Sequence, residues 1–547
     1  MPGTRLSITE KKLKRWWDST PDQPHACLSA ITVKGSPGLR GISDLELVFK
    51  YPISVICGRN GAGKSTILAL AALAFEPPTG CASYNAIKRT RKIKGHPEDV
   101  YYYTFGDFFY KGPRDPDISG VTIQWSYTGA PFRKLIKKQS SKWMRYETRP
   151  KRPVHFIGLS RAIHPIEQKS LRGHFNGSMK SSKTNWTDLS PDMLSRFAEI
   201  VGKQYDEASS LSNGANKTIN SCKAGSAYSG FNMGSGEDIV LGILSLIDEI
   251  PKGGLIVIEE IEVGLFPQAQ HKLMKHLLEL ALEKKLQVII TTHSDHIIDQ
   301  VPREARIMLQ ASLGTPHEVT YSPSTRYATG SMLGTSQHEA AILCEDTFAK
   351  IWIRELISMK LSKRLTIDDI GSCSELPRAA AYKVKSSKNE KLILAFDGDV
   401  KRSDIRKWFA EERCKEVFTK PANQQRVSSI LLPGLIPPER FVASELMRTP
   451  QGLEALASEL NCTDFEAKTA LEQCLAEEDE HVIPYALAQH ANISSKDLAS
   501  QQLSKAFAHA YPATVESISS QLTDILDSNG DGEIKWDEIY PKKEHSV

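Results

Sequence analysis

The chain has 547 residues, which at about 150 residues per domain predicts three or four folding units. Lys and Arg number 69 and Asp and Glu 65, and the net charge of +4 excludes a uniformly basic, histone-like protein but not local basic patches. The nine cysteines are scattered without a CxxC pair, which argues against a zinc ribbon or a secreted disulfide scaffold. Without an apolar leader or a run of about 18 apolar residues, we expect a soluble, cytoplasmic protein.

The predicted elements alternate between strands and helices in the first third of the chain. We expect a helix, three strands and a buried helix, in this order: Ile8–Trp17, Leu28–Val33, Leu45–Phe49, Ile53–Cys57 and residues 66–76. From about 80 to 230 the pattern changes to basic runs, aromatics and a Ser/Asn/Gly-rich segment, which indicates an inserted lobe. Strands over Leu255–Ile258 and Val288–Ile290 then resume the α/β pattern.

The turn after Ile53–Cys57 fits the phosphate-binding motif G-x-x-x-x-G-K-[ST]. Its glycines let backbone N–H groups face phosphate oxygens, while Lys64 neutralises phosphate charge and the Ser65 hydroxyl ligates Mg²⁺. An apolar strand before the motif and a helix after it supply the required context. The expected nucleotide contacts are Gly58, Arg59, Asn60, Gly61, Ala62, Gly63, Lys64, Ser65 and Thr66.

Three distant elements complete the expected ATPase site. Glu259 and Glu260 end the strand Leu255–Ile258, where the first would hold Mg²⁺ and the second would orient the attacking water. His293, after the next strand, would bond to the γ-phosphate or to that water. Ser235 and Gly236 open a predicted helix in a segment similar to the signature motif, which binds the γ-phosphate held by a neighbouring subunit.

This order and spacing resemble the ATPase half of OLD-type (overcoming lysogenization defect) and SMC-like ABC families. Glu259, Glu260 and Glu262 form an EExE similar to the EEPE of those families, with Ile261 in place of proline and Glu259 where most relatives have Asp. The resemblance implies a homodimer or higher homo-oligomer with ATP held between two chains. It places an ABC/SMC-type α/β domain at 1–335, with the inserted basic lobe at about 80–230.

A second group of carboxylates follows residue 340. The strand Ala341–Cys344 runs into Glu345, and a second strand, Leu392–Phe396, runs into Asp397 and Asp399. Parallel strands would bring these carboxylates to one edge, where they suit Mg²⁺ or Mn²⁺. This resembles the Rossmann-like Toprim module of nucleases, primases and topoisomerases. We place a Toprim-like domain at 336–450 and a helical C-terminal region at 451–547.

The resemblance has one departure. OLD-type nucleases usually carry a second carboxylate four residues after the first Glu, and here that position is Ala349. Three interpretations stay open: Asp346 or Glu439 compensates, the site holds one metal well, or the site is degenerate. The alternative to a Toprim-like site is two α/β strands that end in solvated acids.

Basic segments point to nucleic acid. Lys88–Lys94 carries five positive charges, and Arg133–Arg152 carries nine together with Trp143 and Tyr146. Basic side chains follow phosphates and aromatic rings stack on bases, so this lobe is a candidate surface for DNA or RNA. The alternative is an ordinary solvated face.

Residues 527–538 fit a twelve-residue EF-hand loop. A weak or structural Ca²⁺ site and a metal-free acidic turn are both open, and the short exit segment and Lys535 argue against a sensor. The expected ligands are Asp527, Asn529, Asp531, Glu533 and Glu538.

The leading hypothesis is an ATPase, with ATP and Mg²⁺ as cofactors, that controls nucleic-acid cleavage in antiphage defence, as the resemblance to OLD-like and Septu-like families implies. Cleavage is performed either by the chain's own Toprim-like site or by a partner HNH nuclease, as in Septu-type systems, some of which accompany a retron reverse transcriptase. The alternatives are an SMC-like DNA repair ATPase, disfavoured by the lack of long heptads, and a transporter subunit, disfavoured by the Toprim-like segment.

Overall fold

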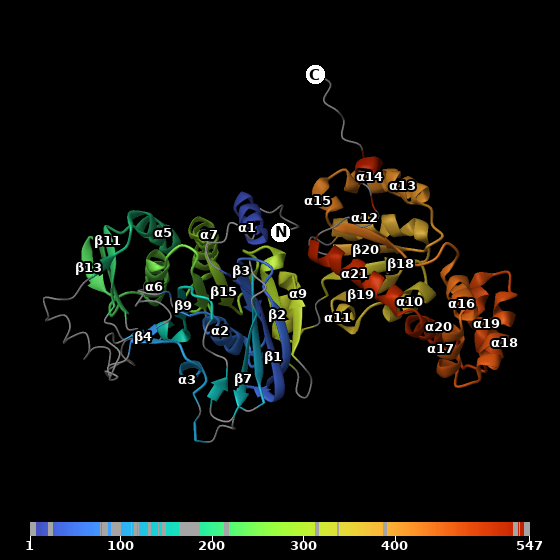
Figure 1. The fold of residues 1–547 in the computed structure, drawn as a ribbon. Coiled ribbons are helices and arrows are strands. Elements are labelled where there is room, and N and C mark those ends of the chain that lie inside the picture. The colour runs from blue at the N-terminus through green and yellow to red at the C-terminus, as the bar shows by residue number, and fades with distance from the viewer. Residues whose placement is uncertain are drawn as a thin grey trace. The chain divides into compact units, whose positions relative to one another are not determined.

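The computed structural model describes most of the chain, in two compact units, Leu6–Thr335 and Ser336–Val547 (Figure 1). The described residues are 7–19, 26–76, 78, 86–88, 100–110, 112–113, 118, 120–128, 133–139, 142–144, 149–162, 186–212, 218–311, 317–335, 338–386, 391–528, 534 and 536–540.

The N-terminal unit contains a six-stranded sheet with the order β17-β16-β3-β15-β14-β9. All neighbouring strands in it are parallel except the edge strand β17. The strands β3, β14 and β15 are buried on both faces, which is why the sequence shows them as unbroken apolar runs. The bounds are β3 Ile53–Cys57, β9 Val154–Ile157, β14 Leu255–Ile258, β15 Gln287–Thr291, β16 Arg306–Gln310 and β17 Glu318–Tyr321.

A second sheet, antiparallel and five-stranded, has the order β2-β1-β6-β7-β8. The helix α2 (Lys64–Ala72) contacts strands of both sheets. From β6, Trp125 Nε1 donates a hydrogen bond to Leu70 O at 3.0 Å, and Tyr127 Oη donates to Ala74 O at 2.7 Å. The helix after the P-loop is therefore fixed from both sides. The bounds are β1 Leu28–Leu39, β2 Ile42–Val48, β6 Thr122–Tyr127, β7 Arg133–Gln139 and β8 Lys142–Met144.

The rest of the N-terminal unit consists of two small sheets and several helices. The sheet β10-β11-β12-β13 is antiparallel, and β4 pairs with β5. Helix α5 packs against α6 and α7, and α1 packs against α7. The bounds are α1 Ile8–Asp18, β4 Ala86–Lys88, β5 Val100–Tyr102, α3 Phe105–Phe108, η2 Leu159–Ala162, β10 Thr187–Asp188, α5 Pro191–Val201, β11 Glu207–Ser212, β12 Thr218–Ala224, β13 Ser226–Ser229, α6 Ser235–Glu249, α7 Pro267–Lys284, α8 Asp295–Ile298, η3 Arg303–Ala305 and α9 Thr325–Leu333.

The predicted inserted lobe at about 80–230 needs correction. Strand β6 pairs with β1 from Leu28 onward, and β9 pairs with β14 inside the six-stranded sheet. Both strands belong to the two larger sheets of the N-terminal unit although they lie inside the predicted lobe. The sequence could not reveal this, because each strand pairs with a segment about 100 residues away, and local periodicity carries no record of distant pairing.

The C-terminal unit contains a parallel four-stranded sheet with the order β19-β18-β20-β21. Alternate residues of each strand face two separate cores. Along β18, for example, Ile342 packs in one core and Leu343 in the other. The sheet is therefore the middle layer between helices, as in doubly wound α/β proteins. The bounds are β18 Ala340–Cys344, β19 Leu365–Asp369, β20 Lys391–Phe396 and β21 Val427–Leu431.

The region 451–547, predicted to be helical, contains helices where the structure describes it, and they pack on the preceding sheet. Its helices α17, α20 and α21 share one apolar core with α10 and with side chains of β18 and β20. Because that core is continuous, the region from 451 packs as part of the same unit. The helical bounds are α10 Thr347–Leu356, α11 Met359–Ser362, η4 Cys373–Glu375, α12 Leu376–Ser386, α13 Arg402–Ala410, α14 Glu412–Phe418, α15 Pro421–Gln424, α16 Pro438–Arg448, α17 Pro450–Leu460, α18 Asp464–Leu475, η5 Glu480–Val482, α19 Ile483–His490, α20 Lys496–Ala510, α21 Pro512–Ser528 and α22 Trp536–Ile539.

Among the described residues, no helix combines the length and the apolar character needed to span a membrane.

Candidate functional site

The P-loop follows β3 at its carboxyl end. Gly58 has φ 143°, and a Cβ there would lie 2.1 Å from Leu309 O of the neighbouring strand β16, so only glycine fits. Lys64 Nζ donates hydrogen bonds to Gly58 O at 2.8 Å and to Arg59 O at 3.0 Å, which folds the lysine back over its own loop. The loop thus has the geometry of a phosphate cradle with its cation inside it.

The other predicted P-loop contacts differ in exposure. The side chains of Arg59, Asn60 and Ser65 are exposed, and the backbone of Gly61 lies at the surface with φ 81°. Ala62 and Thr66 are buried, at 2% and 4% exposure. The loop therefore offers the Ser65 hydroxyl to a ligand but buries the Thr66 side chain.

The predicted acidic and histidine residues lie at the same sheet edge as the P-loop. Ile258 of β14 is in register with Ile290 of β15, which is in register with Val55 of β3, so these three strands end together. Glu260 follows β14 and His293 follows β15, and His293 Nε2 lies 3.8 Å from Glu260 Oε1. Carboxyl ends of parallel strands are where α/β proteins bind ligands.

Glu260 has a strained backbone, with φ 45° in the left-handed region that non-glycine residues rarely adopt. Its N–H donates to Thr291 Oγ1 at 2.9 Å, and its carbonyl accepts from Arg161 Nη2 at 2.5 Å. These two bonds hold the strained turn, which aims the Glu260 carboxylate toward His293.

Glu262 has a positioning role that the sequence pattern did not assign. Its carboxylate accepts hydrogen bonds from Thr292 Oγ1 at 2.8 Å and from the His293 N–H at 2.6 Å. It thereby ties the loop after β14 to the loop after β15. The signal in the sequence was the third acid of the EExE segment.

Burial and charge set the protonation states at this edge. Burial lowers the pKa of Lys64, although Glu260 and the neighbouring acids work in the opposite direction. Burial, and then Lys64, lower the pKa of His293, so its imidazole is neutral at pH 7. Its Nε2 has no hydrogen-bond partner among the described residues, which leaves one ring nitrogen for a ligand.

Oxygen donors for Mg²⁺ are present beside the cradle. The Ser65 hydroxyl is exposed, and Glu259, which follows β14, is half-buried. Hydroxyl and carboxylate oxygens are ligands that Mg²⁺ accepts, so this donor set fits the metal that accompanies ATP.

The predicted signature segment opens α6. Ser235 is its first residue and is exposed. Just beyond it, the Glu237 carboxylate accepts hydrogen bonds from Tyr205 Oη, from Tyr228 Oη at 2.8 Å and from Lys203 Nζ at 3.1 Å. These partners come from the segment around β11–β13, and they fix the start of α6 so that Ser235 faces outward.

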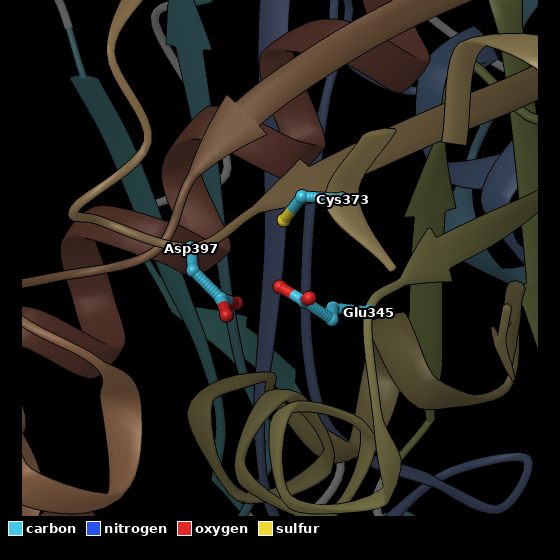
Figure 2. A group of neighbouring side chains, drawn as sticks. All are labelled: Glu345, Cys373 and Asp397. Atoms are coloured by element: carbon cyan, nitrogen blue, oxygen red, sulfur yellow. The ribbon is translucent and has the colours of Figure 1, made fainter. Parts of the chain in front are cut away.

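In the C-terminal unit, Glu345 and Asp397 come together as predicted from the strand ends. Leu343 of β18 is in register with Leu394 of β20, so Glu345 and Asp397 leave the same edge of the sheet. Cys373 of η4 joins them, and one ligand atom from each residue lies within 4.8 Å of the others (Figure 2). Burial, followed by Glu345, raises the pKa of Asp397 to about 9. Asp399 is exposed and is not part of this group.

A second group of possible metal ligands includes Asp346, the residue after Glu345. Asp346, Glu439 and His481 also bring ligand atoms within 4.8 Å of one another. Glu439 is 2% exposed, and His481 Nδ1 lies 3.1 Å from its Oε1. Sequence reasoning had proposed Asp346 and Glu439 separately, but no local pattern marked His481. Ala349 is fully buried in the apolar core of α10, and its N–H caps onto Asp346 at 2.8 Å.

The EF-hand-like loop lies mostly outside the described residues, among them Asn529, Asp531 and Glu533. The two end positions are described. Asp527 accepts a hydrogen bond from Arg364 Nη2 at 3.2 Å, and Glu538 forms an ion pair with Arg406. Both acids at the ends of the predicted calcium loop therefore contact arginines.

The basic segments contribute partly to the protein interior. Arg152 is fully buried and donates to Gly253 O at 2.7 Å and to Gln287 Oε1 at 2.7 Å. Trp143 stacks on Phe105 with ring centroids 4.0 Å apart, so it packs within the protein. Tyr146 and residues 89–94 lie outside the described residues. Arg152 and Trp143 are thus structural and do not belong to the predicted nucleic-acid surface.

Two protein-family models match the N-terminal unit. The "AAA domain" model matches residues 37–144 and the "AAA ATPase domain" model matches residues 159–298. Together with the P-loop geometry, these matches support a P-loop ATPase domain in the unit Leu6–Thr335.

Among curated proteins, the chain is similar to the Septu protein PtuA of Bacillus thuringiensis. The two are 24% identical over 330 residues, which cover 53% of this chain and 78% of PtuA. Solved structures similar to it include the SMC head domain from Thermotoga maritima (12% identity, TM-score 0.28, 54% of this chain and 98% of that one). Another is the Smc head domain with an extended coiled coil, bound to the C-terminal domain of ScpA, derived from Pyrococcus furiosus (10%, TM-score 0.32, 54% and 96%). These TM-scores are too low to add to the description of the fold.

Proposed function

We propose that the chain is the ATPase of a Septu-type antiphage defence system, in which ATP binding and hydrolysis control the cleavage of nucleic acid. The observation that carries the proposal is the meeting of Lys64, Glu260 and His293 at one sheet edge, where the two AAA models also match. The similarity to the Septu protein PtuA supports the role in defence.

The residues of this edge divide the work of hydrolysis. The P-loop amides and Lys64 Nζ bind the phosphates, and Lys64 leaves its present carbonyl partners to do so. Glu260 orients the attacking water and takes its proton, while neutral His293 donates or accepts a hydrogen bond beside it. Ser65 and Glu259 would hold Mg²⁺, which would neutralise phosphate charge. Glu262 keeps both loops in place.

A dimer completes the site in this proposal. Ser235 is exposed at the start of α6, which suits contact with a γ-phosphate held by a second copy of the chain. A helix N-terminus with free N–H groups stabilises an anion. Hydrolysis therefore requires two chains.

The defence role is tested in cells that carry the native locus. Phage plaques are counted with the parent chain, with Lys64→Ala, and with Lys252→Ala, an exposed lysine, as the matched control. We expect Lys64→Ala to lose protection and Lys252→Ala to keep it. If the parent gives no protection but its deletion sensitises cells to DNA damage, the SMC-like repair alternative takes the lead.

A second candidate function is metal-dependent nucleic-acid cleavage by the chain's own C-terminal unit, as a Toprim-like site would perform. The approach of Glu345 and Asp397 favours it, because two carboxylates at one edge can hold a cation for phosphodiester chemistry. Purified chain is assayed on DNA and RNA with Mg²⁺ or Mn²⁺, beside Asp397→Asn. If the parent chain cleaves a substrate and Asp397→Asn does not, the chain itself is the nuclease. If the parent chain cleaves none of the substrates, a separate nuclease performs the cleavage.

A further inference from the structure

The group Glu345, Cys373 and Asp397 combines two carboxylates with a thiol. The three residues come from three different loops at the carboxyl edge of the parallel sheet, after β18, after β19 and after β20. Figure 2 shows both carboxylates and the Cys373 sulfur directed toward a common space. Their ligand atoms lie within 4.8 Å of one another, which is the spacing of donors around one cation.

The backbone fixes this arrangement. The loop after β19 bends over Glu345 through hydrogen bonds from Ile370 N to Cys344 O at 2.9 Å and from Gly371 N to Glu345 O at 2.6 Å. That bend brings Cys373 beside Glu345. On the other side, a Cβ at Gly398 would lie 2.4 Å from Gly434 O, so a close backbone approach fixes the turn that carries Asp397. The backbone positions that carry the three donors are thus fixed by the scaffold.

An independent observation indicates that a ligand is expected here. Asp397 is only 9% exposed, and although its carboxyl group interacts with Glu345, its Oδ1 has no hydrogen-bond partner among the described residues. A buried carboxyl oxygen without a partner is unfavourable, because it has lost its bonds to water. Because this carboxylate points toward Glu345 and Cys373, a cation in their midst would remove that cost (Figure 2).

The sulfur of Cys373 indicates which kind of cation this group of residues would bind. It is 5% exposed, and packing alone would suit an apolar residue of the core that it borders. Its sulfur nevertheless lies among carboxylates, where an apolar side chain would gain nothing. Mg²⁺ takes oxygen ligands, whereas a thiolate selects zinc and similar softer ions.

We propose that Glu345, Cys373 and Asp397 form a three-ligand site for a thiophilic divalent ion, Zn²⁺, with the remaining position open. On binding, the Cys373 S–H bond and the Asp397 O–H bond break, sulfur and oxygen bond to the metal, and both protons leave to solvent. Three protein ligands with one open position are typical of zinc sites that also bind a further molecule. The inference goes beyond the proposed function and does not rest on it, since the site binds this ion whether or not the chain cleaves nucleic acid.

The test uses Co²⁺ as a spectroscopic substitute for Zn²⁺ in the purified, chelator-treated full chain. We expect one equivalent of Co²⁺ to produce a thiolate-to-cobalt absorption band, and Zn²⁺ to displace it. Cys373→Ser should remove the band and weaken Zn²⁺ binding by more than about tenfold, because losing even an outer-shell partner costs that much. Asp397→Asn, which keeps the sulfur, should weaken binding as well. Cys462→Ser, at a half-buried cysteine of the same unit, should change neither.

Three results would overturn the proposal. The parent chain could bind Co²⁺ without a thiolate band, as the oxygen and nitrogen donors of Asp346, Glu439 and His481 would produce. The band could persist in Cys373→Ser, or Asp397→Asn could bind as tightly as the parent. The nuclease assay with Mg²⁺ or Mn²⁺ is scored separately, so failure of the zinc site and failure of the nuclease function give different results.

Discussion

The parallel strands of both sheets gather charged side chains at the same kind of edge, but only the first of the two edges includes a lysine among its carboxylates. In the N-terminal unit Lys64 lies close to Glu259, Glu260 and Glu262, so that edge holds a cation beside its carboxylates. In the C-terminal unit the converging side chains are Glu345, Asp397 and Cys373, which are donors for a cation. One topology can therefore present different chemical groups at the same edge, according to which residues its loops carry.

The largest expected effect is on ATP hydrolysis at the sheet edge of the N-terminal unit, which carries Glu260. Glu260→Gln keeps the side chain's shape but removes its basicity, so it should bind ATP and hydrolyse it about 10²–10⁴-fold more slowly. Phosphate release and nucleotide binding are measured in parallel. Asp188→Asn, at an exposed carboxylate of β10, is the control and should hydrolyse ATP at the parent rate. Parent-like hydrolysis by Glu260→Gln would remove Glu260 from the mechanism.

The next prediction concerns the positive charge of Lys64 in the P-loop. Lys64→Ala removes the positive charge from the cradle, and hydrogen bonds to charged groups contribute roughly 1.5–3 kcal/mol, so ATP affinity should fall about 10- to 150-fold. Equilibrium binding of a labelled nucleotide measures it, with Lys252→Ala as the control. Unchanged affinity in Lys64→Ala would mean that the loop does not hold phosphate.

The stability of the C-terminal unit, whose sheet edge carries Glu345 and Asp397, should depend on metal and not on nucleotide. Co²⁺ at a hundredfold excess over its dissociation constant should stabilise the C-terminal unit by about 2.7 kcal/mol, a rise of roughly 5–10 °C in its melting temperature. Asp397→Asn should lose this rise, and Asp497→Asn, at an exposed position of α20, should keep it. An equal rise in all three proteins would indicate that the metal binds elsewhere.

The smallest expected effect tests the proposal that two chains together form each ATP-hydrolysing site. Ser235→Arg puts a bulky charge where a neighbour's γ-phosphate would sit, so this variant and Lys64→Ala should each be inactive alone. Mixed in equal amounts, they should regain one working site per mixed dimer and about half the parent's ATPase activity per such dimer, if the two sites act independently. Mixed dimers that form but stay inactive would contradict a shared site.

The sequence predicted what depends on local pattern. Strands β3 and β14 have the predicted bounds, because strands buried on both faces are short apolar runs. Glu345 and Asp397 were expected together, because parallel strands end at one edge. Cys373 and His481 were missed, since each reaches its group through a loop or helix whose course depends on tertiary packing. For the same reason the sequence could not assign β6 and β9 to the core sheets, or join the region from 451 to the second unit.

The strand order of the six-stranded sheet has a consequence for biosynthesis. Strand β3, which carries the P-loop, lies between β15 and β16, and both are encoded more than 200 residues later. As the chain leaves the ribosome, both edges of β3 stay unpaired until β15 has emerged, and one edge stays unpaired until β16 has emerged. Unpaired apolar strand edges promote association with other chains. A truncated product that ends before β15 therefore contains the complete phosphate-binding motif but cannot form the site, and we expect it to aggregate or to require a chaperone.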